Sequence, residues 1–173
     1  MTRANGLTLL RIILVPVFLV ILYLGFPGAD WVALAVFVVA SLTDLLDGWT
    51  ARHYGEVSNL GKFMDPLADK VQVCAAMCWL IQRGSMAGWV LAAVLLREFA
   101  VSGLRLVAAE RGKVIAAAWS GKVKTFSTMV CICLLLVFHV GWLDILCQII
   151  ILGTTLYSGV EYFVKNLHVF KEK

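Results

Sequence analysis

Four aspartates stand as two closely spaced pairs in a chain that is otherwise largely apolar. Asp44 and Asp47 are three residues apart, and Asp65 and Asp69 are four residues apart. Residues at these spacings share one face of a helix, so each pair forms a stripe of carboxylates. Carboxylate oxygens are the ligands that Mg²⁺ and Mn²⁺ prefer, so the two stripes predict a divalent-metal site.

Two metal ions account for these carboxylates better than neighbouring cations do. Arg52, Lys62 and Lys70 lie nearby, but they do not neutralise four carboxylates in an apolar setting. Two ions held close together would do so, and would stabilise the attacking and leaving oxygens of a phosphoryl transfer. The alternative, a salt-bridged helix end, leaves unexplained the small residues that make space beside the aspartates. These are Gly48, Ala51 and Gly61.

The elements that carry these residues are predicted to be membrane-spanning helices. The chain of 173 residues is 61% hydrophobic and 15% charged, with a mean hydropathy of +0.90, which is typical of an integral membrane protein. One span needs roughly 20 apolar residues. The apolar segments are about 7–26, 31–52, 61–82, 86–109, 120–140 and 143–164. The predicted fold class is therefore all-α, a single membrane domain over 1–173 with six transmembrane helices.

The basic residues predict the orientation of these helices. Arg83 is the only lysine or arginine in the first, third and fifth connections together, whereas most of the others lie near the termini and the second and fourth connections. The positive-inside rule then places both termini in the cytoplasm, with an even number of spans. The net charge of +4 suits an anionic membrane surface and anionic substrates, and no nucleic-acid partner is expected. We expect a multi-pass protein of a bacterial cell membrane, with its active site facing the cytoplasm.

A second set of charged residues lies in the same half of the predicted membrane domain. Arg97 and Arg105 are eight residues apart on the fourth segment, and Lys122 and Lys124 begin the fifth. Cations beside a metal site favour an acceptor that carries its own anion, most simply a phosphate. Two alternatives remain open. Lys122, Lys124 and Arg105 would reach lipid head groups, or Arg97 would pair with Glu98, although adjacent side chains diverge by about 100° around a helix.

The stretch from Asp44 to Asp69 resembles a known family signature. Its spacing, D-x2-D-G-x2-A-R-x8-G-x3-D-x3-D, agrees at every specified position with the signature of the CDP-alcohol phosphotransferases. Those enzymes are six-helix membrane proteins, usually homodimers. They transfer a phosphatidyl group from CDP-diacylglycerol, or a related phosphoryl group, to an alcohol and release CMP. The resemblance implies the same fold and the same class of reaction.

The resemblance also implies a role for each residue of the signature. The ligands of two Mg²⁺ ions, or Mn²⁺ ions, would be Asp44, Asp47, Asp65 and Asp69. The residues that contact CDP would be Gly48, Ala51, Arg52 and Gly61. Asp69 would also act as the general base, and the guanidinium of Arg52 would meet the CDP phosphates.

Further segments resemble one branch of that family, the bacterial phosphatidylglycerophosphate synthases. They are residues 5–11, 61–70, 97–105, 121–125 and 158–163. The acceptor of that branch is sn-glycerol 3-phosphate, and the resemblance implies that Arg97, Arg105 and Lys122, with Lys124 beside them, bind its phosphate. One departure is Ala4, where a proline commonly precedes the asparagine, and it concerns only the start of the first helix.

Two other functions remain as alternatives. A sister enzyme of the same family would use another polar acceptor, such as inositol phosphate. A divalent-cation transporter would use the aspartates as a translocation site. The transporter explains carboxylates in membrane helices, but neither the small residues beside them nor the nearby cations.

Overall fold

Six helices make up the regular secondary structure in the computed structural model, which describes the backbone of residues 3–54, 59–110, 112, 115 and 118–166. Side chains are described over the same ranges except at residues 3–8, 44–54, 59–66 and 69. The helices are α1 (Arg3–Leu24), α2 (Ala29–Tyr54), α3 (Asn59–Gln82), α4 (Gly88–Glu110), α5 (Trp119–Val137) and α6 (Gly141–Asn166). The all-α prediction is confirmed, and each helix lies close to its predicted segment.

Short connections fix the two breaks that precede α2 and α4. Gly28 has a φ of 90° and Gly84 a φ of 83°, values that favour glycine because a Cβ strains this conformation. The backbone N–H of Gly84 donates to the carbonyl of Ile81 at 3.0 Å, and this turn ends α3. By contrast, α3 begins at Asn59, well before Pro66. Pro66 therefore lies inside the helix and not at its first residue.

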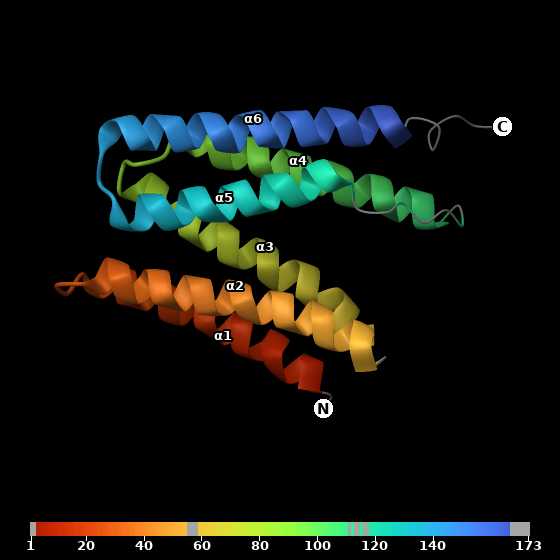
Figure 1. Ribbon diagram of the computed structural model, residues 1–173, viewed down its shortest axis with the longest axis horizontal. Helices are drawn as coiled ribbons and strands as arrows, with labels where there is room; N and C mark the ends of the chain where they lie inside the picture. Colours follow the sequence, from red (N-terminus) through yellow and green to blue (C-terminus); the bar gives the residue numbers. More distant parts are fainter. Residues whose placement is uncertain (1–2, 55–58, 111, 113–114, 116–117, 167–173) are drawn as a thin grey trace.

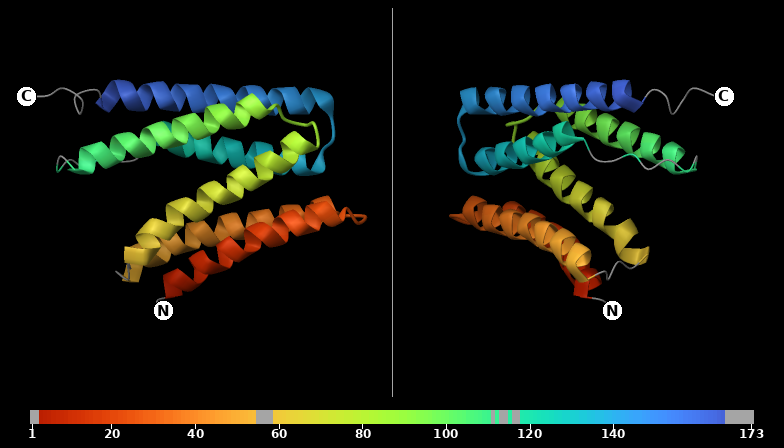
Figure 2. Two further views of the ribbon diagram at one scale, coloured as in Figure 1. Left: turned by 180° about the vertical axis from the view of Figure 1, so that it is seen from behind. Right: turned by 45° about the vertical axis from the view of Figure 1, so that its right-hand side comes forward.

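Helix α3 lies between two groups of helices (Figure 1). On one side α1 packs along α2, and on the other side α5 packs along α6 with α4 against α6. Figure 2 shows α3 crossing obliquely between them, in contact with both. The start of α1 and the end of α6 lie at one end of the bundle, the terminal end, together with the ends of α2 and α4 (Figure 1).

The two ends of the bundle have different interiors. A large apolar core fills the end opposite the terminal end and draws on every helix, for example on Phe18, Phe37, Met77, Val90 and Leu135. Toward the terminal end the buried apolar cluster is small, consisting of Val101, Leu104, Ala108 and Tyr162. Buried polar residues there include Arg11, Gln72, Ser120, Lys124 and Ser158. Most of the buried polar side chains that the structure describes thus lie outside the large apolar core.

The outer surface is apolar along much of its area. Large side chains such as Leu96, Phe126 and Trp142 are about 70% exposed (73%, 71% and 67%). Within the described residues, α5 and α6 are long and apolar enough to cross a membrane, and shorter apolar runs cover Leu9–Leu24 and Ala29–Thr43. Such a surface is suited to lipid and indicates a membrane protein.

Candidate active site

The predicted metal ligands lie on two neighbouring helices. Helix α2 runs without a break through Asp44 and Asp47, and α3 runs through Asp65 and Asp69. The side chains of these aspartates lie outside the described residues, as do those of the predicted CDP-binding residues Gly48, Ala51, Arg52 and Gly61. Among the side chains that are described, no group of three His, Cys, Asp or Glu is placed to hold a metal ion. The four aspartates are not part of that set.

Hydrogen bonds join α2 to α3 about one helical turn from the aspartates. The amide Nε2 of Gln72 donates to Ser41 Oγ at 3.1 Å and to the carbonyl of Phe37 at 2.9 Å. Ser41 is three residues before Asp44, and Gln72 is three residues after Asp69. This contact therefore holds α2 against α3 about one turn from both positions.

Three cations from three helices surround one carboxylate, that of Glu98. Its Oε1 lies 2.9 Å from Lys124 Nζ and 3.0 Å from an Nη of Arg97, and its Oε2 lies 3.9 Å from Lys70 Nζ. Lys70, Arg97, Glu98 and Lys124 form the Glu98 cluster. Their side chains are 31%, 13%, 21% and 5% exposed, so the charges are largely shielded from solvent. Among the described side chains, three cations share this one carboxylate, so the cluster has an excess of positive charge that is suited to an anion.

The Glu98 cluster is next to the helix that carries the second aspartate pair. Lys70 directly follows Asp69 on α3, and its Nζ donates to Ser102 Oγ on α4 at 2.7 Å. Lys70 therefore links the aspartate helix to the helix of Arg97 and Glu98. The structure thus places Arg97 and Lys124 around the same carboxylate as Lys70, the residue that follows Asp69 on α3.

The guanidinium of Arg97 is enclosed by α5 and α6. Its Nη2 donates to Ser158 Oγ. A Cβ added at Gly121 would lie 3.4 Å from Nη2, and one at Gly159 would lie 3.3 Å from Cγ, so both glycines make room for the arginine. The Nε of Arg97 is buried and has no hydrogen-bond partner among the described residues. Arg97 is thus fixed in place and still has donors for a ligand.

Arg105 is also packed against α6, two turns beyond Arg97. Its Nε donates to the hydroxyl of Tyr162 at 2.8 Å, and its guanidinium carbon lies 5.6 Å from the centre of the tyrosine ring. Ser158 and Tyr162 are four residues apart and so share a face of α6. The predicted stripe of two arginines on α4 thus meets a stripe of two hydroxyl groups on α6.

The two predicted lysines of α5 point in different directions. Lys124 is buried against Glu98, whereas Lys122 is exposed and its Nζ lies 5.7 Å from the centre of the Trp119 ring. Residues two apart point to nearly opposite sides of a helix, so the structure does not bring Lys122 to the Glu98 cluster. The alternative of a lysine that reaches outward fits Lys122 and does not fit Lys124.

One argument from helix geometry is wrong. Arg97 and Glu98 are adjacent in sequence, and their divergence around the helix was expected to keep them apart. Their side chains form an ion pair at 3.0 Å, because the long arginine side chain reaches around the helix. The pair is not an isolated neutral one, however, since Lys124 and Lys70 share the same carboxylate.

Comparison with known proteins identifies the family. The model of the CDP-alcohol phosphatidyltransferase family matches residues 1–157, which is most of the chain. The chain belongs to the CDP-alcohol phosphatidyltransferase family. It is thus a transferase by family, in agreement with the signature between Asp44 and Asp69.

Several bacterial members of this family resemble the chain over most of its length. A Bacillus subtilis protein named CDP-diacylglycerol–glycerol-3-phosphate 3-phosphatidyltransferase is 37% identical over 96% of both chains. A probable phosphatidylglycerophosphate synthase of Mycobacterium tuberculosis is 41% identical over 95% of this chain and 81% of its own length. An Escherichia coli protein with the same name as the Bacillus protein is 41% identical over 75% of this chain and 74% of its own length.

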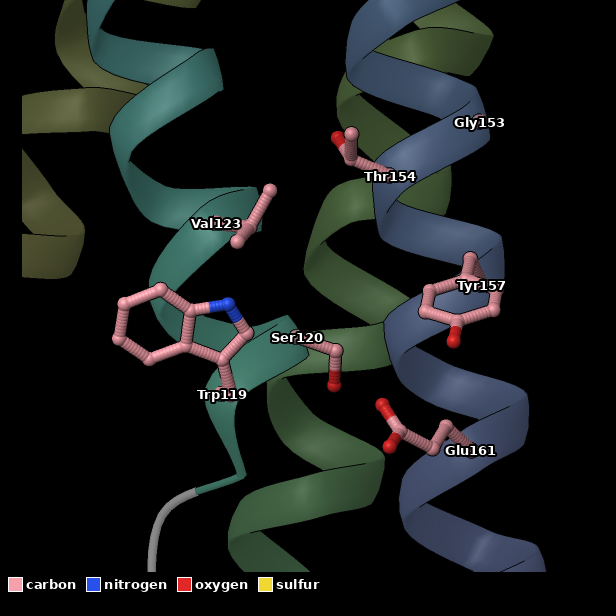
Figure 3. A pocket seen from close by; sticks show the side chains of 7 residues that line it. All are labelled: Trp119, Ser120, Val123, Gly153, Thr154, Tyr157 and Glu161. Atoms are coloured by element: carbon pink, nitrogen blue, oxygen red, sulfur yellow. The ribbon is translucent and has the colours of Figure 1, made fainter.

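A cavity of about 250 Å³ lies between α5 and α6, and no residue of the Glu98 cluster lines it. It is lined by Trp119, Ser120, Val123, Gly153, Thr154, Tyr157 and Glu161, none of which is a predicted site residue of this phosphatidyltransferase (Figure 3). The side chains of Ser120 and Glu161 point toward one another at its polar end. Glu161 also forms an ion pair with Lys165, so this part of α6 has its own counter-ion.

Four residues that contact the predicted acceptor-binding cations or their neighbour Lys70 were given no role from the sequence. Glu98 and Ser102 lie on α4, and Ser158 and Tyr162 lie on α6. The sequence did contain an indication for Glu98, because an acidic residue in an apolar helix requires partners. The spacing of four between Ser158 and Tyr162 was a weaker indication that the two hydroxyl groups share one face. Arg11, used only to predict orientation, is fully buried in α1 (0% exposed).

Proposed function

We propose that this chain transfers the phosphatidyl group of CDP-diacylglycerol to sn-glycerol 3-phosphate, giving phosphatidylglycerophosphate and CMP. The observation that carries the proposal is the position of the Glu98 cluster, whose excess positive charge borders the aspartate helix α3. An aspartate signature for the transfer thus lies beside an anion site for the acceptor. The names of the relatives in Bacillus subtilis and Escherichia coli support the same donor and acceptor.

The donor side of the reaction is assigned to α2 and the first half of α3. Four carboxylates on two joined helices are a hard-oxygen donor set that fits two Mg²⁺ or Mn²⁺ ions. The ligands would be Asp44, Asp47, Asp65 and Asp69. When bound, these ions would stabilise negative charge on the phosphates of the donor and on the departing CMP. Gly48, Ala51 and Gly61 leave space for the nucleotide, and Arg52 meets its phosphates.

The acceptor side is assigned to α4 and α5. Arg97 and Lys124 bind the phosphate of glycerol 3-phosphate, with Arg105 further along the same face of α4. This leaves the C1 hydroxyl of the acceptor toward α3, where Asp69 takes its proton. The freed oxygen attacks the phosphorus nearest the diacylglycerol, the bond from that phosphorus to CMP breaks, and the phosphatidyl group is transferred in one step. Lys122 is not included, because it lies on the outer side of α5.

The chain is proposed to cross a bacterial cell membrane six times, with the site facing the cytoplasm. The start of α1 and the end of α6 lie at the same end of the bundle, which supports an even number of crossings (Figure 1). The aspartate pairs and the Glu98 cluster lie toward that end, which would face the cytoplasm. We further propose that the enzyme works as a homodimer, as is usual in this family.

The decisive experiment measures CMP release by the purified protein in detergent, with CDP-diacylglycerol, Mg²⁺ and one acceptor at a time. The acceptors are glycerol 3-phosphate, inositol 1-phosphate, inositol and serine. Release with glycerol 3-phosphate alone is expected. Release with another acceptor alone would retain the transferase and overturn the acceptor assignment. If a folded protein released no CMP but carried Mn²⁺ into liposomes, the transporter would replace the enzyme.

A matched pair of variants on α2 tests the metal site within the same assay. Asp44→Asn is expected to abolish CMP release and its dependence on Mg²⁺, because it removes a charged ligand. Asp30→Asn, at the other end of the same helix, is the control and is expected to retain both. Full activity of Asp44→Asn would exclude the proposed site.

A further inference from the structure

Glu98 contacts every cation of its cluster but has the wrong charge to bind a phosphate. Its Oε1 accepts from both Arg97 and Lys124, at 3.0 and 2.9 Å. We propose that Glu98 is the positioning residue of the acceptor site, holding these two cations in place for the acceptor phosphate without contacting it. The inference rests on the proposed function and adds a residue to it.

The need for such a residue follows from burial. The side chain of Lys124 is 5% exposed and that of Arg97 is 13% exposed, and both lie within helices whose outer surfaces are apolar. An ammonium or guanidinium group in that setting requires a counter-ion, or it turns toward water. Glu98 supplies the counter-ion while no acceptor is bound. It therefore keeps both cations turned inward at the place where the phosphate arrives.

The geometry also sets where the two cations lie relative to each other. Because Arg97 and Lys124 bond to the same carboxylate oxygen, their nitrogen atoms are neighbours on it. Each group still has donors that no described residue uses, including the buried Nε of Arg97. Two adjacent cations with free donors match two oxygens of one phosphate, which is the arrangement that a charge-assisted site requires.

Glu98 further connects the acceptor site to the aspartate helix. Its Oε2 lies 3.9 Å from Lys70 Nζ, which also donates to Ser102 on α4. Lys70 is adjacent to Asp69, the proposed base. Through Lys70, the carboxylate therefore helps to hold α4 beside α3. Loss of the Glu98 charge is expected to disorder the acceptor site and to leave the aspartates of α2 and α3 in place, because Lys70 keeps its hydrogen bond to Ser102.

The test compares Glu98→Gln with Glu161→Gln in the CMP-release assay. Glu161 is a matched control, because its side chain is also 21% exposed and is paired with a lysine, Lys165. For Glu98→Gln, KM for glycerol 3-phosphate is expected to rise about tenfold, with kcat and KM for CDP-diacylglycerol within about twofold. Glu98→Asp keeps the charge and is expected to recover part of the loss. Glu161→Gln is expected to leave all three constants unchanged.

A double-mutant cycle with Lys124→Met separates positioning from other roles. If Glu98 acts through Lys124, the change in KM caused by Glu98→Gln must be much smaller when Lys124 is already absent. Additive effects would overturn the inference. So would a lower KM in Glu98→Gln, which would make Glu98 a competitor of the phosphate, or a loss of kcat alone, which would make it a catalytic group.

Two further measurements, the unfolding temperature of Glu98→Gln and the activity of the wild-type protein, distinguish the remaining explanations. A fall in the unfolding temperature with equal losses for both substrates would mark Glu98 as merely structural. The cycle is run with whichever phosphorylated acceptor the wild-type protein uses. An inactive wild type would therefore refute the proposed function, whereas an active wild type with an unchanged KM in Glu98→Gln would refute this inference alone.

Discussion

Two arginines at opposite ends of the bundle use their guanidinium groups differently. Arg83, in the connection between α3 and α4, donates from Nε to Ser85 Oγ at 3.1 Å and from Nη1 to the carbonyl of Leu136 at 3.2 Å. Its Nη2 donates to the carbonyl of Leu135, and His139 Nε2 lies 2.7 Å from Nη1. Each nitrogen of Arg83 therefore has a partner. In Arg97 the Nε has none among the described residues.

The difference teaches how to separate a structural cation from a binding one in a membrane bundle. The carbonyls near the end of α5 lack partners within the helix, and Arg83 satisfies two of them. It is therefore committed to holding α3 and α5 together. Arg97 is bonded only to side chains, is surrounded by other cations, and retains donors. A cation with unused donors and excess positive charge around it is the one suited to a substrate anion.

The sharpest test of this contrast replaces each arginine by lysine. In Arg97→Lys, kcat/KM for glycerol 3-phosphate is expected to fall about 100-fold, because a lysine cannot reproduce the planar fork of donors and roughly 3 kcal/mol of binding is lost. The assay is CMP release at varied acceptor concentration. KM for CDP-diacylglycerol should change little.

The matched variant is Arg83→Lys at the opposite end. Its activity per folded molecule is expected to stay within about threefold of the wild type, since no substrate group reaches it. A comparable loss of kcat/KM in both lysine variants would show that the two ends do not differ in function.

A second prediction concerns stability. In Arg83→Ala, two carbonyls of α5 and the neighbouring polar groups lose a charged donor, so the free energy of unfolding is expected to fall by about 2 kcal/mol. For a chain of this size that corresponds to a fall of roughly 6 °C in the unfolding temperature, measured in detergent. Arg97→Ala should lose less stability than Arg83→Ala. The reverse order would mean that Arg97 holds the bundle together.

The fold was largely predictable from the sequence because composition and period alone specify membrane helices. Apolar stretches of sufficient length predicted six helices, and the structure has them close to the expected residues. The place of Pro66 in α3 could not be decided from the sequence, because a proline is compatible with either a helix start or a helix interior and only contacts with other helices decide between them.

The site was predictable only in part. The arginine spacing of eight correctly placed Arg97 and Arg105 on one face of α4, because helical geometry is local. Which residues face them is a matter of tertiary packing, so Ser158 and Tyr162 of α6 had no assigned role.

Lys122 and Lys124 were grouped because both are cationic. Their spacing of two, however, places them on nearly opposite sides of α5, as the structure shows. The expectation that Arg97 and Glu98 would stay apart considered only the directions of their Cα–Cβ bonds and neglected the length of the arginine side chain.

A smaller effect is expected for the hydroxyl that holds Arg105. Tyr162→Phe removes the acceptor of the Arg105 Nε–H bond and keeps the ring against which the guanidinium packs. One hydrogen bond to a charged group contributes about 1 kcal/mol here, since Arg105 is exposed, so KM for glycerol 3-phosphate should rise about fivefold. Tyr157→Phe, on the outer side of the same helix, is the control and should leave KM unchanged. Equal effects of the two would argue against Arg105 in the acceptor site.

The smallest expected effect tests how tightly Arg97 is positioned. In Gly159→Ala the new Cβ would lie 3.3 Å from Arg97 Cγ, so the arginine must move by a few tenths of an ångström, whereas Gly103→Ala on α4 meets nothing within 4 Å. Both changes favour the helix by up to about 1 kcal/mol, so neither should lower the unfolding temperature. KM for glycerol 3-phosphate is expected to rise about threefold in Gly159→Ala and to stay unchanged in Gly103→Ala. Gly159→Ala alters only the position of Arg97 and removes none of its donors. An unchanged KM would therefore show that the site tolerates a displaced guanidinium. The contrast with the firmly bonded Arg83 would then lie in the surrounding charge and not in the position of the arginine.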